Sequence, residues 1–103
     1  MNEMMKLKEM LVEANIAHTC VNLDKRLFGP NAMQIRIYKD DTLQKELDDV
    51  VFHKGSYGYE QGLLETCRLG DCSGYETAEE VFNGWMKIFF KPIKRNKKKR
   101  KTC

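Results

Sequence analysis

The C-terminal end of this chain is so basic that only the residues before it are suited to building a folded core. From Lys91 to Lys101, eight of eleven residues are basic and none is acidic. Residues 1–90 hold 10 basic and 15 acidic side chains, a net charge of −5. A dense run of like charges repels itself and stays solvated. We therefore expect one domain over residues 1–91 and a flexible basic tail over residues 92–103.

Apolar periodicity predicts a helix at the start of the domain. Met4, Leu7 and Leu11 recur at steps of three and four residues, which is the spacing of one helical face. The predicted helix covers residues 3–14, and Asn2 is a suitable cap for its first turn.

A second helix is predicted at the end of the domain. Thr77-Ala78-Glu79-Glu80 has the pattern of a capping box, and Pro92 would stop the helix at about Lys91. Its apolar arc is wider than a surface helix needs: Val81, Phe82, Trp85, Met86, Ile88, Phe89 and Phe90. We expect Met86 and Phe90 to lie outside the core, as part of a protein interface. The alternative is that loops or the first helix cover them.

The middle of the chain reads as short strands. Residues 34–39 alternate apolar and polar side chains, the pattern of a sheet with one wet face, and residues 17–24 and 50–52 are further strands. Residues 63–69 fit a strand or a short helix, and residues 42–49 are ambiguous. The expected fold class is α+β: a small antiparallel sheet of three or four strands with an N-terminal and a C-terminal helix.

Turn-forming residues separate these segments. We expect turns at residues 25–32, at Asp40-Asp41 and over residues 70–74. The loop Ser56-Tyr57-Gly58-Tyr59 places two tyrosines around a glycine, and tyrosine suits recognition because it offers a rigid ring with a polar tip. The alternative is a hairpin turn whose tyrosines cover the edge of the core. The candidate protein interface comprises Tyr57, Tyr59, Trp85, Met86 and Phe90.

The basic tail is a candidate for binding nucleic acid without reading sequence, because clustered cations displace the counterions of phosphates. The residues concerned are Lys94, Arg95, Lys97, Lys98, Lys99, Arg100 and Lys101. No aromatic residue lies among them, so base stacking is not expected. Anionic lipid or an acidic protein are alternative partners, and a solvated end with no partner is the alternative to all three.

Cysteine usage and the absence of an export signal indicate a cytoplasmic protein. The chain has Cys20, Cys67, Cys72 and Cys103, which we expect to be free thiols in the cytosol. Cys67, Cys72 and His53 form at best an incomplete zinc ligand set, so no metal and no cofactor are expected. No apolar run approaches the roughly 18 residues that span a bilayer.

Catalytic patterns are weak in this sequence. His18 and His53 are the only histidines, and nothing places Glu60 or Glu65 near a nucleophile. The glycine spacing in the tyrosine loop does not match a phosphate-binding loop. We therefore expect a binding protein rather than an enzyme, with no catalytic residues.

Two segments carry a resemblance to a family of short phage and prophage proteins from low-GC Gram-positive bacteria. The first runs from Val50 to Glu65 and includes Ser56-Tyr57-Gly58-Tyr59 and Gly62-Leu63-Leu64-Glu65; the second runs from Gly74 to Phe82. The resemblance implies an accessory protein in the bacterial host cytosol, and it implies no reaction and no site residues. The expected function is binding to a host protein or a protein–nucleic-acid complex, with self-association as a further possibility. The alternative is a nucleic-acid-binding protein that uses its tail.

Overall fold

The computed structural model of the chain describes residues 2–68 and 71–90, with side chains described except at residues 67, 68 and 71. The seven candidate nucleic-acid-binding residues of the tail lie outside these ranges. The elements are α1 (Glu3–Glu13), β1 (His18–Asn22), α2 (Lys25–Phe28), β2 (Met33–Tyr38), β3 (Glu46–Phe52), the 3-10 turn η1 (Tyr59–Gln61), β4 (Leu64–Arg68), β5 (Asp71–Glu76) and α3 (Ala78–Ile88).

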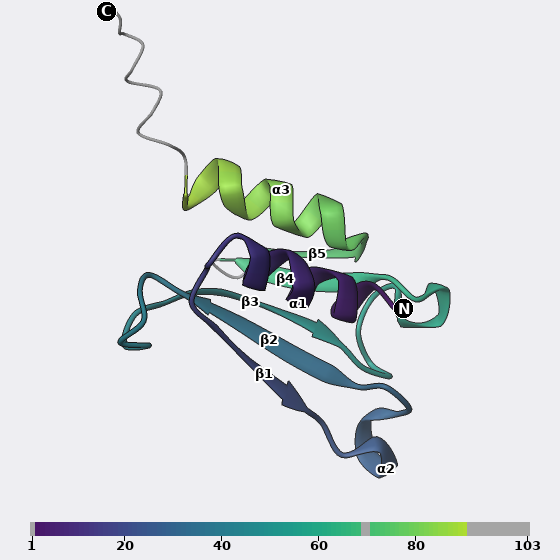
Figure 1. Cartoon of the computed structure of the whole chain (residues 1–103). Coiled ribbons are helices and arrows are strands. Elements are labelled where there is room, and N and C mark those ends of the chain that lie inside the picture. The colour runs from purple at the N-terminus through teal and green to yellow at the C-terminus, as the bar shows by residue number, and fades with distance from the viewer. Residues whose placement is uncertain (1, 69–70, 91–103) are drawn as a thin grey trace, which may run out of the picture.

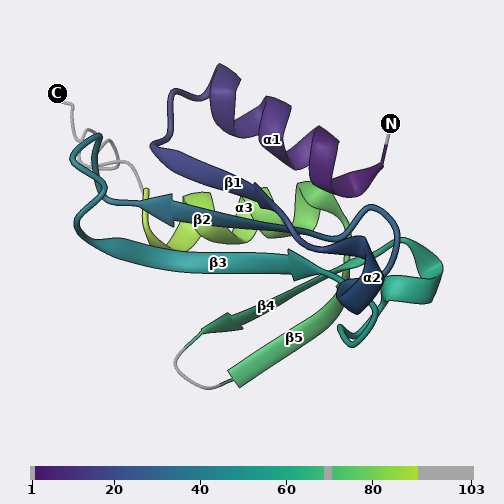
Figure 2. The same cartoon turned by 90° about the horizontal axis from the view of Figure 1, so that it is seen from below.

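The strands form one antiparallel meander in the order β1-β2-β3-β4-β5 (Figure 2). The two longer helices, α1 and α3, lie next to each other over one face of this sheet (Figure 1). The α+β class and the helix at each end of the domain are therefore confirmed. The sheet has five strands over the described residues, where the sequence predicted three or four.

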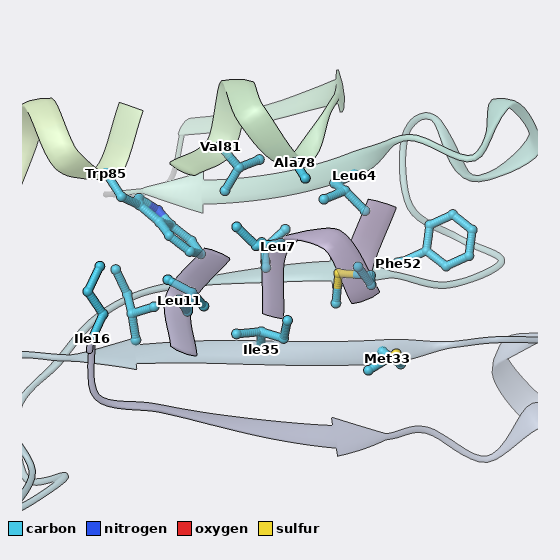
Figure 3. Close-up of a cluster of buried hydrophobic side chains, with 13 residues drawn as sticks. Leu7, Leu11, Ile16, Met33, Ile35, Phe52, Leu64, Ala78, Val81 and Trp85 are labelled. Carbon is cyan, nitrogen blue, oxygen red and sulfur yellow. The ribbon is translucent and has the colours of Figure 1, made fainter. Parts of the chain in front are cut away.

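The hydrophobic core lies between the sheet and the two helices. Leu7 and Leu11 of α1 reach between Ile35 of β2 and the α3 residues Val81 and Trp85 (Figure 3). All five side chains are nearly inaccessible to solvent. Burying a large aliphatic or aromatic side chain contributes about 1.5–3 kcal/mol, so this cluster is what fixes the helices on the sheet.

Both predicted helix starts are present. The side chain of Asn2 accepts a hydrogen bond of 2.8 Å from the N–H of Met5. Thr77 and Glu80 form the reciprocal capping box, with bonds of 3.2 Å from the N–H of Glu80 and 2.9 Å from that of Thr77. The helix α3 ends at Ile88, three residues before the predicted end at Lys91.

The elements that the sequence did not predict include the short helix α2, within residues 25–32 that were expected to form a turn, and the strand β5. Residues 70–74 were expected to form a turn, but residues 71–76 form a strand that pairs with β4. The segment 63–69, left open between strand and helix, contributes β4. In the ambiguous segment 42–49, the strand β3 begins at Glu46.

On the sheet face away from the helices, polar side chains of neighbouring strands pair with one another. Gln34 donates to Asp49 at 2.7 Å, and Arg36 lies 3.6 Å from Glu46. Cross-strand pairs of this kind stabilise a sheet by fractions of a kcal/mol each.

Candidate interaction site

The tyrosine loop folds against β5, and two glycines make this contact possible. A Cβ added at Gly74 would lie 2.2 Å from the Cβ of Tyr57, and one at Gly58 would lie 3.0 Å from the backbone N and Cα of Tyr75. Neither position has room for a side chain. Gly58 also has φ of +96°, which glycine adopts at little cost. The two segments that carry the family resemblance are thus in direct contact.

Tyr75 sits in a β-bulge with a strained backbone. Leu64 pairs with Glu76 and Thr66 pairs with Ser73, so Gly74 and Tyr75 together oppose a single residue of β4. The φ of Tyr75 is +58°, a left-handed conformation that is rare for a bulky side chain. Strain of this kind costs of order 1–3 kcal/mol and tends to occur at functional sites.

The bulge brings the ring of Tyr75 alongside that of Tyr57. The ring centroids are 6.5 Å apart and the ring planes differ by 15°. Both residues remain largely in solvent, at 59% exposure for Tyr57 and 58% for Tyr75. We call this feature the tyrosine pair. It is an exposed aromatic surface that the backbone holds in one place.

Hydrogen bonds fix the loop on which Tyr57 stands. The N–H of Tyr57 donates to Oε1 of Glu65 in β4 at 2.8 Å. At the start of the loop, Ser56 accepts from the N–H of His53 at 3.1 Å and donates to its carbonyl oxygen at 2.8 Å. The pair is therefore held by a closed turn as well as by the bulge.

One shallow hollow adjoins the tyrosine pair, and a second hollow lies next to the first. The first has a volume of about 160 Å³ and is lined by both tyrosines of the pair together with Lys54, Glu60 and Gln61. The second, of about 300 Å³, shares Lys54 and Glu60 with the first. It extends to α2, whose Leu27 is 72% exposed. This end of the molecule thus combines exposed aromatic, aliphatic and charged groups.

Tyr59, predicted at the interface, makes structural contacts and also lines both hollows, and its place at an interface stays a prediction. Its ring packs on Phe52 with centroids 4.7 Å apart, and its hydroxyl donates to the carbonyl oxygen of Pro30 at 3.0 Å. Gly29 lies so close that a Cβ there would be 2.6 Å from the hydroxyl oxygen of Tyr59. Tyr59 therefore joins the loop to the β1–β2 connection, which is the alternative role considered from the sequence.

The residues of the predicted interface in α3 and just after it lie in or against the core. Trp85 is fully buried, which removes it from any surface available to a partner. Met86 and Phe90 are partly buried, pack on the core cluster and line a hollow of about 370 Å³ with Asp40. The apolar residue that α3 leaves in solvent is Ile88, at 54% exposure.

Sequence reasoning missed Tyr75 as a partner of Tyr57. The signal was present, because Ser56-Tyr57-Gly58 and Ser73-Gly74-Tyr75 each combine a serine, a glycine and a tyrosine. What was missing was the knowledge that residues 71–76 form a strand. Without β5, nothing placed the second tyrosine beside the first.

The thiol prediction is wrong at Cys72. This residue is disulfide-bonded, and its register partner across β4 and β5 is Cys67. Cys20 is a free cysteine, and burial raises the pKa of its thiol, which lowers its reactivity.

Within residues 2–66 and 72–90, no three metal-ligating side chains gather in one place. None of the helices in the described part of the chain has the length and apolar composition needed to cross a bilayer.

The chain matches no protein-family model, and no curated protein or solved structure is similar to it at a significant level. The resemblance to phage and prophage proteins stays a prediction from the sequence.

Proposed function

We propose that this chain is a small non-enzymatic accessory protein of a phage or prophage, and that it binds a host protein or a host protein–nucleic-acid complex. The observation that carries the proposal is the tyrosine pair: two largely exposed rings on a backbone that is strained at Tyr75. Strain persists only where the surrounding structure enforces it, and it here serves to present a ring to solvent. Tyrosine is also enriched at protein interfaces, where it loses little conformational entropy on binding.

The two segments that carry the resemblance are in contact in the fold. Ser56-Tyr57-Gly58 belongs to the resembling pattern and Gly74-Tyr75 lies in the second resembling segment, and they meet through glycines that admit no side chain. The motif residues therefore do more than form a turn and a helix start. These residues form one surface, and this contact is a physical reason for the two segments to occur together in a sequence.

Affinity capture from a lysate of a Gram-positive host, with and without nuclease, tests the proposal. We expect the full-length protein to retain a protein partner after nuclease treatment. The double variant Tyr57→Ser with Tyr75→Asn should lose that partner, and asparagine is chosen because it tolerates the left-handed backbone. Ile88→Gln is the matched control, because it removes an exposed apolar group from α3. Capture that is unchanged in the double variant would overturn the proposal.

A second candidate function is nucleic-acid binding through the basic tail. Its specific support is the charge of the segment, eight basic residues in eleven. The domain itself adds little to this, because residues 1–90 carry a net charge of −5. In the capture experiment, this function predicts that every partner is released by nuclease and that the tyrosine variants behave like the parent.

A further inference from the structure

The strand β1 lies at one edge of the sheet, and its outward backbone groups have no partner within residues 2–68 and 71–90 (Figure 2). The N–H of Leu23 donates to the carbonyl oxygen of Ala32 in the segment before β2, and the carbonyl oxygen of Ala17 accepts from β2, each at 2.9 Å. Residues that bond to the neighbouring strand alternate along an antiparallel pair. The odd-numbered residues of 17–23 therefore bond to the β2 side. The residues between them direct their N–H and C=O groups away from the sheet: His18, Cys20 and Asn22.

The edge at β1 lacks the protection that the edge at β5 has. Proteins usually shield a free edge with charged side chains, proline or a bulge. The strand β5 begins at Asp71, ends at Glu76 and contains the bulge at Tyr75, whose N–H donates to the carbonyl oxygen of Tyr57 at 3.4 Å. In β1, His18-Thr19-Cys20-Val21-Asn22, there is no Asp, Glu, Lys, Arg or Pro, and the register with β2 has no shift. This difference indicates that β1 is suited to pairing with a further strand.

Exposed apolar side chains flank this edge on both faces of the sheet. Burial raises the pKa of the Cys20 thiol and the ammonium of Lys8 partly offsets the rise, so the Lys8 side of α1 lies near β1. Met5 and Val12 share this side of α1, at steps of three and four residues from Lys8, and both are exposed. Val21 is exposed on the opposite face, because its side chain alternates with that of Cys20. A strand added at this edge would cover apolar surface above and below it, while Lys8 can keep its ammonium in solvent.

The charges at the two ends of β1 favour a second copy of the chain in the opposite direction. Near the start of β1 stand two cations and three carboxylates, besides the neutral ion pair of Arg36 with Glu46: Glu13, Lys39, Asp40, Asp41 and Lys45. Near its end stand three cations and two carboxylates: Asp24, Lys25, Arg26, Lys54 and Glu60. An antiparallel copy brings ends of unlike net charge together, and the uncharged strands between them add no repulsion. A strand from the chain's own basic tail would instead find no acid in β1.

We propose that β1 pairs with β1 of a second copy of this chain, in antiparallel orientation, and so forms a two-fold dimer with one continuous sheet. The register that pairs all five residues sets Cys20 opposite the same residue of the second copy, and Thr19 opposite Val21 of the second copy. Met5 and Val12 of both α1 helices then flank the seam. Because β5 is the other edge of each sheet, the two tyrosine pairs lie at the two outer ends of the continuous sheet. This inference goes beyond the proposed function and does not depend on it.

Amide hydrogen exchange of the full-length protein, measured by NMR over a range of concentrations, tests the pairing. The outward amides of His18, Cys20 and Asn22 should exchange more slowly as the concentration rises, whereas those of Thr19 and Val21 should be protected throughout. Sedimentation equilibrium should show a monomer–dimer equilibrium over the same range. A chain that is monomeric at about 1 mM, or outward amides that do not respond to concentration, would overturn the inference. Outward amides that are protected at every concentration and lose this protection on truncation after Lys91 would show that the tail is the occupant, which also overturns it.

Matched lysine variants test whether the seam is at β1. Val21→Lys should raise the dimer dissociation constant by about tenfold or more, because it adds a cation from each copy beside the seam. Val12→Lys should act in the same direction from the other face. Ile88→Lys is the control, since it makes the same charge change at an exposed apolar position on α3 and should leave the constant nearly unchanged. Far-UV circular dichroism should show the parent fold in each variant, because all three side chains are exposed. Dissociation constants that are equal for Val21→Lys and Ile88→Lys would place the dimer contact elsewhere and contradict the inference.

Discussion

The indole N–H of Trp85 donates a hydrogen bond of 2.7 Å to Oδ2 of Asp48, and both residues are buried. This bond joins α3 to β3 through the core. A buried carboxylate is costly unless it accepts hydrogen bonds. Oδ1 of Asp48 also accepts from the N–H of Asp49 at 2.8 Å. The bond to Trp85 therefore lets the sheet carry an acid on its helix-facing side and fixes which way the indole points.

Replacing Trp85 by phenylalanine should destabilise the domain by about 1–3 kcal/mol, because Asp48 loses the indole N–H as a donor in a buried site. Urea unfolding measures the change. Asp48→Asn is the companion variant, since its amide oxygen can still accept from the indole, and it should cost less than Asp48→Ala. A Trp85→Phe protein as stable as the parent would show that the bond contributes nothing.

The carboxylate of Glu3 joins the starts of the two helices. Its Oε1 accepts a hydrogen bond of 2.7 Å from the N–H of Ala78, the first residue of α3. This bond, aided by Lys6, holds the pKa of Glu3 below its usual value. The stabilisation is present above the pKa of an unfolded glutamate, near about 4.3, and is lost as pH falls through the lower folded pKa.

Replacing Glu3 by glutamine should therefore lower stability at neutral pH by about 0.3–1 kcal/mol, the range for an anion at a helix N-terminus. The difference from the parent should shrink on acidification below pH about 4, since the parent then loses its own charge. Thermal unfolding across pH measures both effects. A constant difference down to pH about 2 would contradict the assigned role of the charge.

Replacing Gly74 by alanine should destabilise the domain, whereas replacing Gly84 by alanine should stabilise it. At Gly74 the added Cβ would lie 2.2 Å from the Cβ of Tyr57, so Gly74→Ala should cost about 1–3 kcal/mol through overpacking. At Gly84, inside α3, an added Cβ would meet nothing within 4 Å beyond its chain neighbours and the backbone of its own helix, so Gly84→Ala should stabilise by about 0.5–1 kcal/mol. Chemical denaturation of both variants tests the pair. A neutral Gly74→Ala would mean that the loop and β5 are not interlocked.

Elements marked by residues within one helical turn were predicted correctly from the sequence. Elements that depend on contact with a segment far along the chain were not. Asn2 and the Thr77–Glu80 box mark helix starts by chemistry within one turn, and both are present. The strand β5 was missed because Gly74 reads as a turn residue. Its actual role is to admit Tyr57 of a loop seventeen residues earlier, and no local pattern contains that contact.

The start of β3 was ambiguous for a related reason. The register of β2 and β3 shifts between Ile37 and Tyr38, which breaks the alternation that a strand prediction relies on. The buried Asp48 adds a charged residue where the pattern calls for an apolar one, and its hydrogen bonds, among them those from the indole of Trp85 and the N–H of Asp49, make this possible. Of the candidate site, Tyr57 was predicted by composition and loop chemistry, whereas Tyr75 required the bulge.

Truncation after Lys91 should separate folding from nucleic-acid binding. Residues 92–103 contain one large apolar side chain, Ile93, so their removal should leave the thermal midpoint of the domain unchanged. Seven basic residues leave with the segment, and the net charge falls from +3 to −4. Repulsion from the acidic domain should then abolish any binding to DNA or RNA.

The full-length protein should lose nucleic-acid affinity by about 10³-fold or more between roughly 50 and 200 mM salt, as six or more phosphate contacts require, with little preference for sequence. The matched control is a full-length chain in which the seven tail cations are replaced by glutamine, because it keeps the length and removes the charge. This variant should behave like the truncated protein. Nucleic-acid affinity that survives either change, or that barely responds to salt, would place the binding site on the folded domain. It would exclude the tail as the source of the affinity.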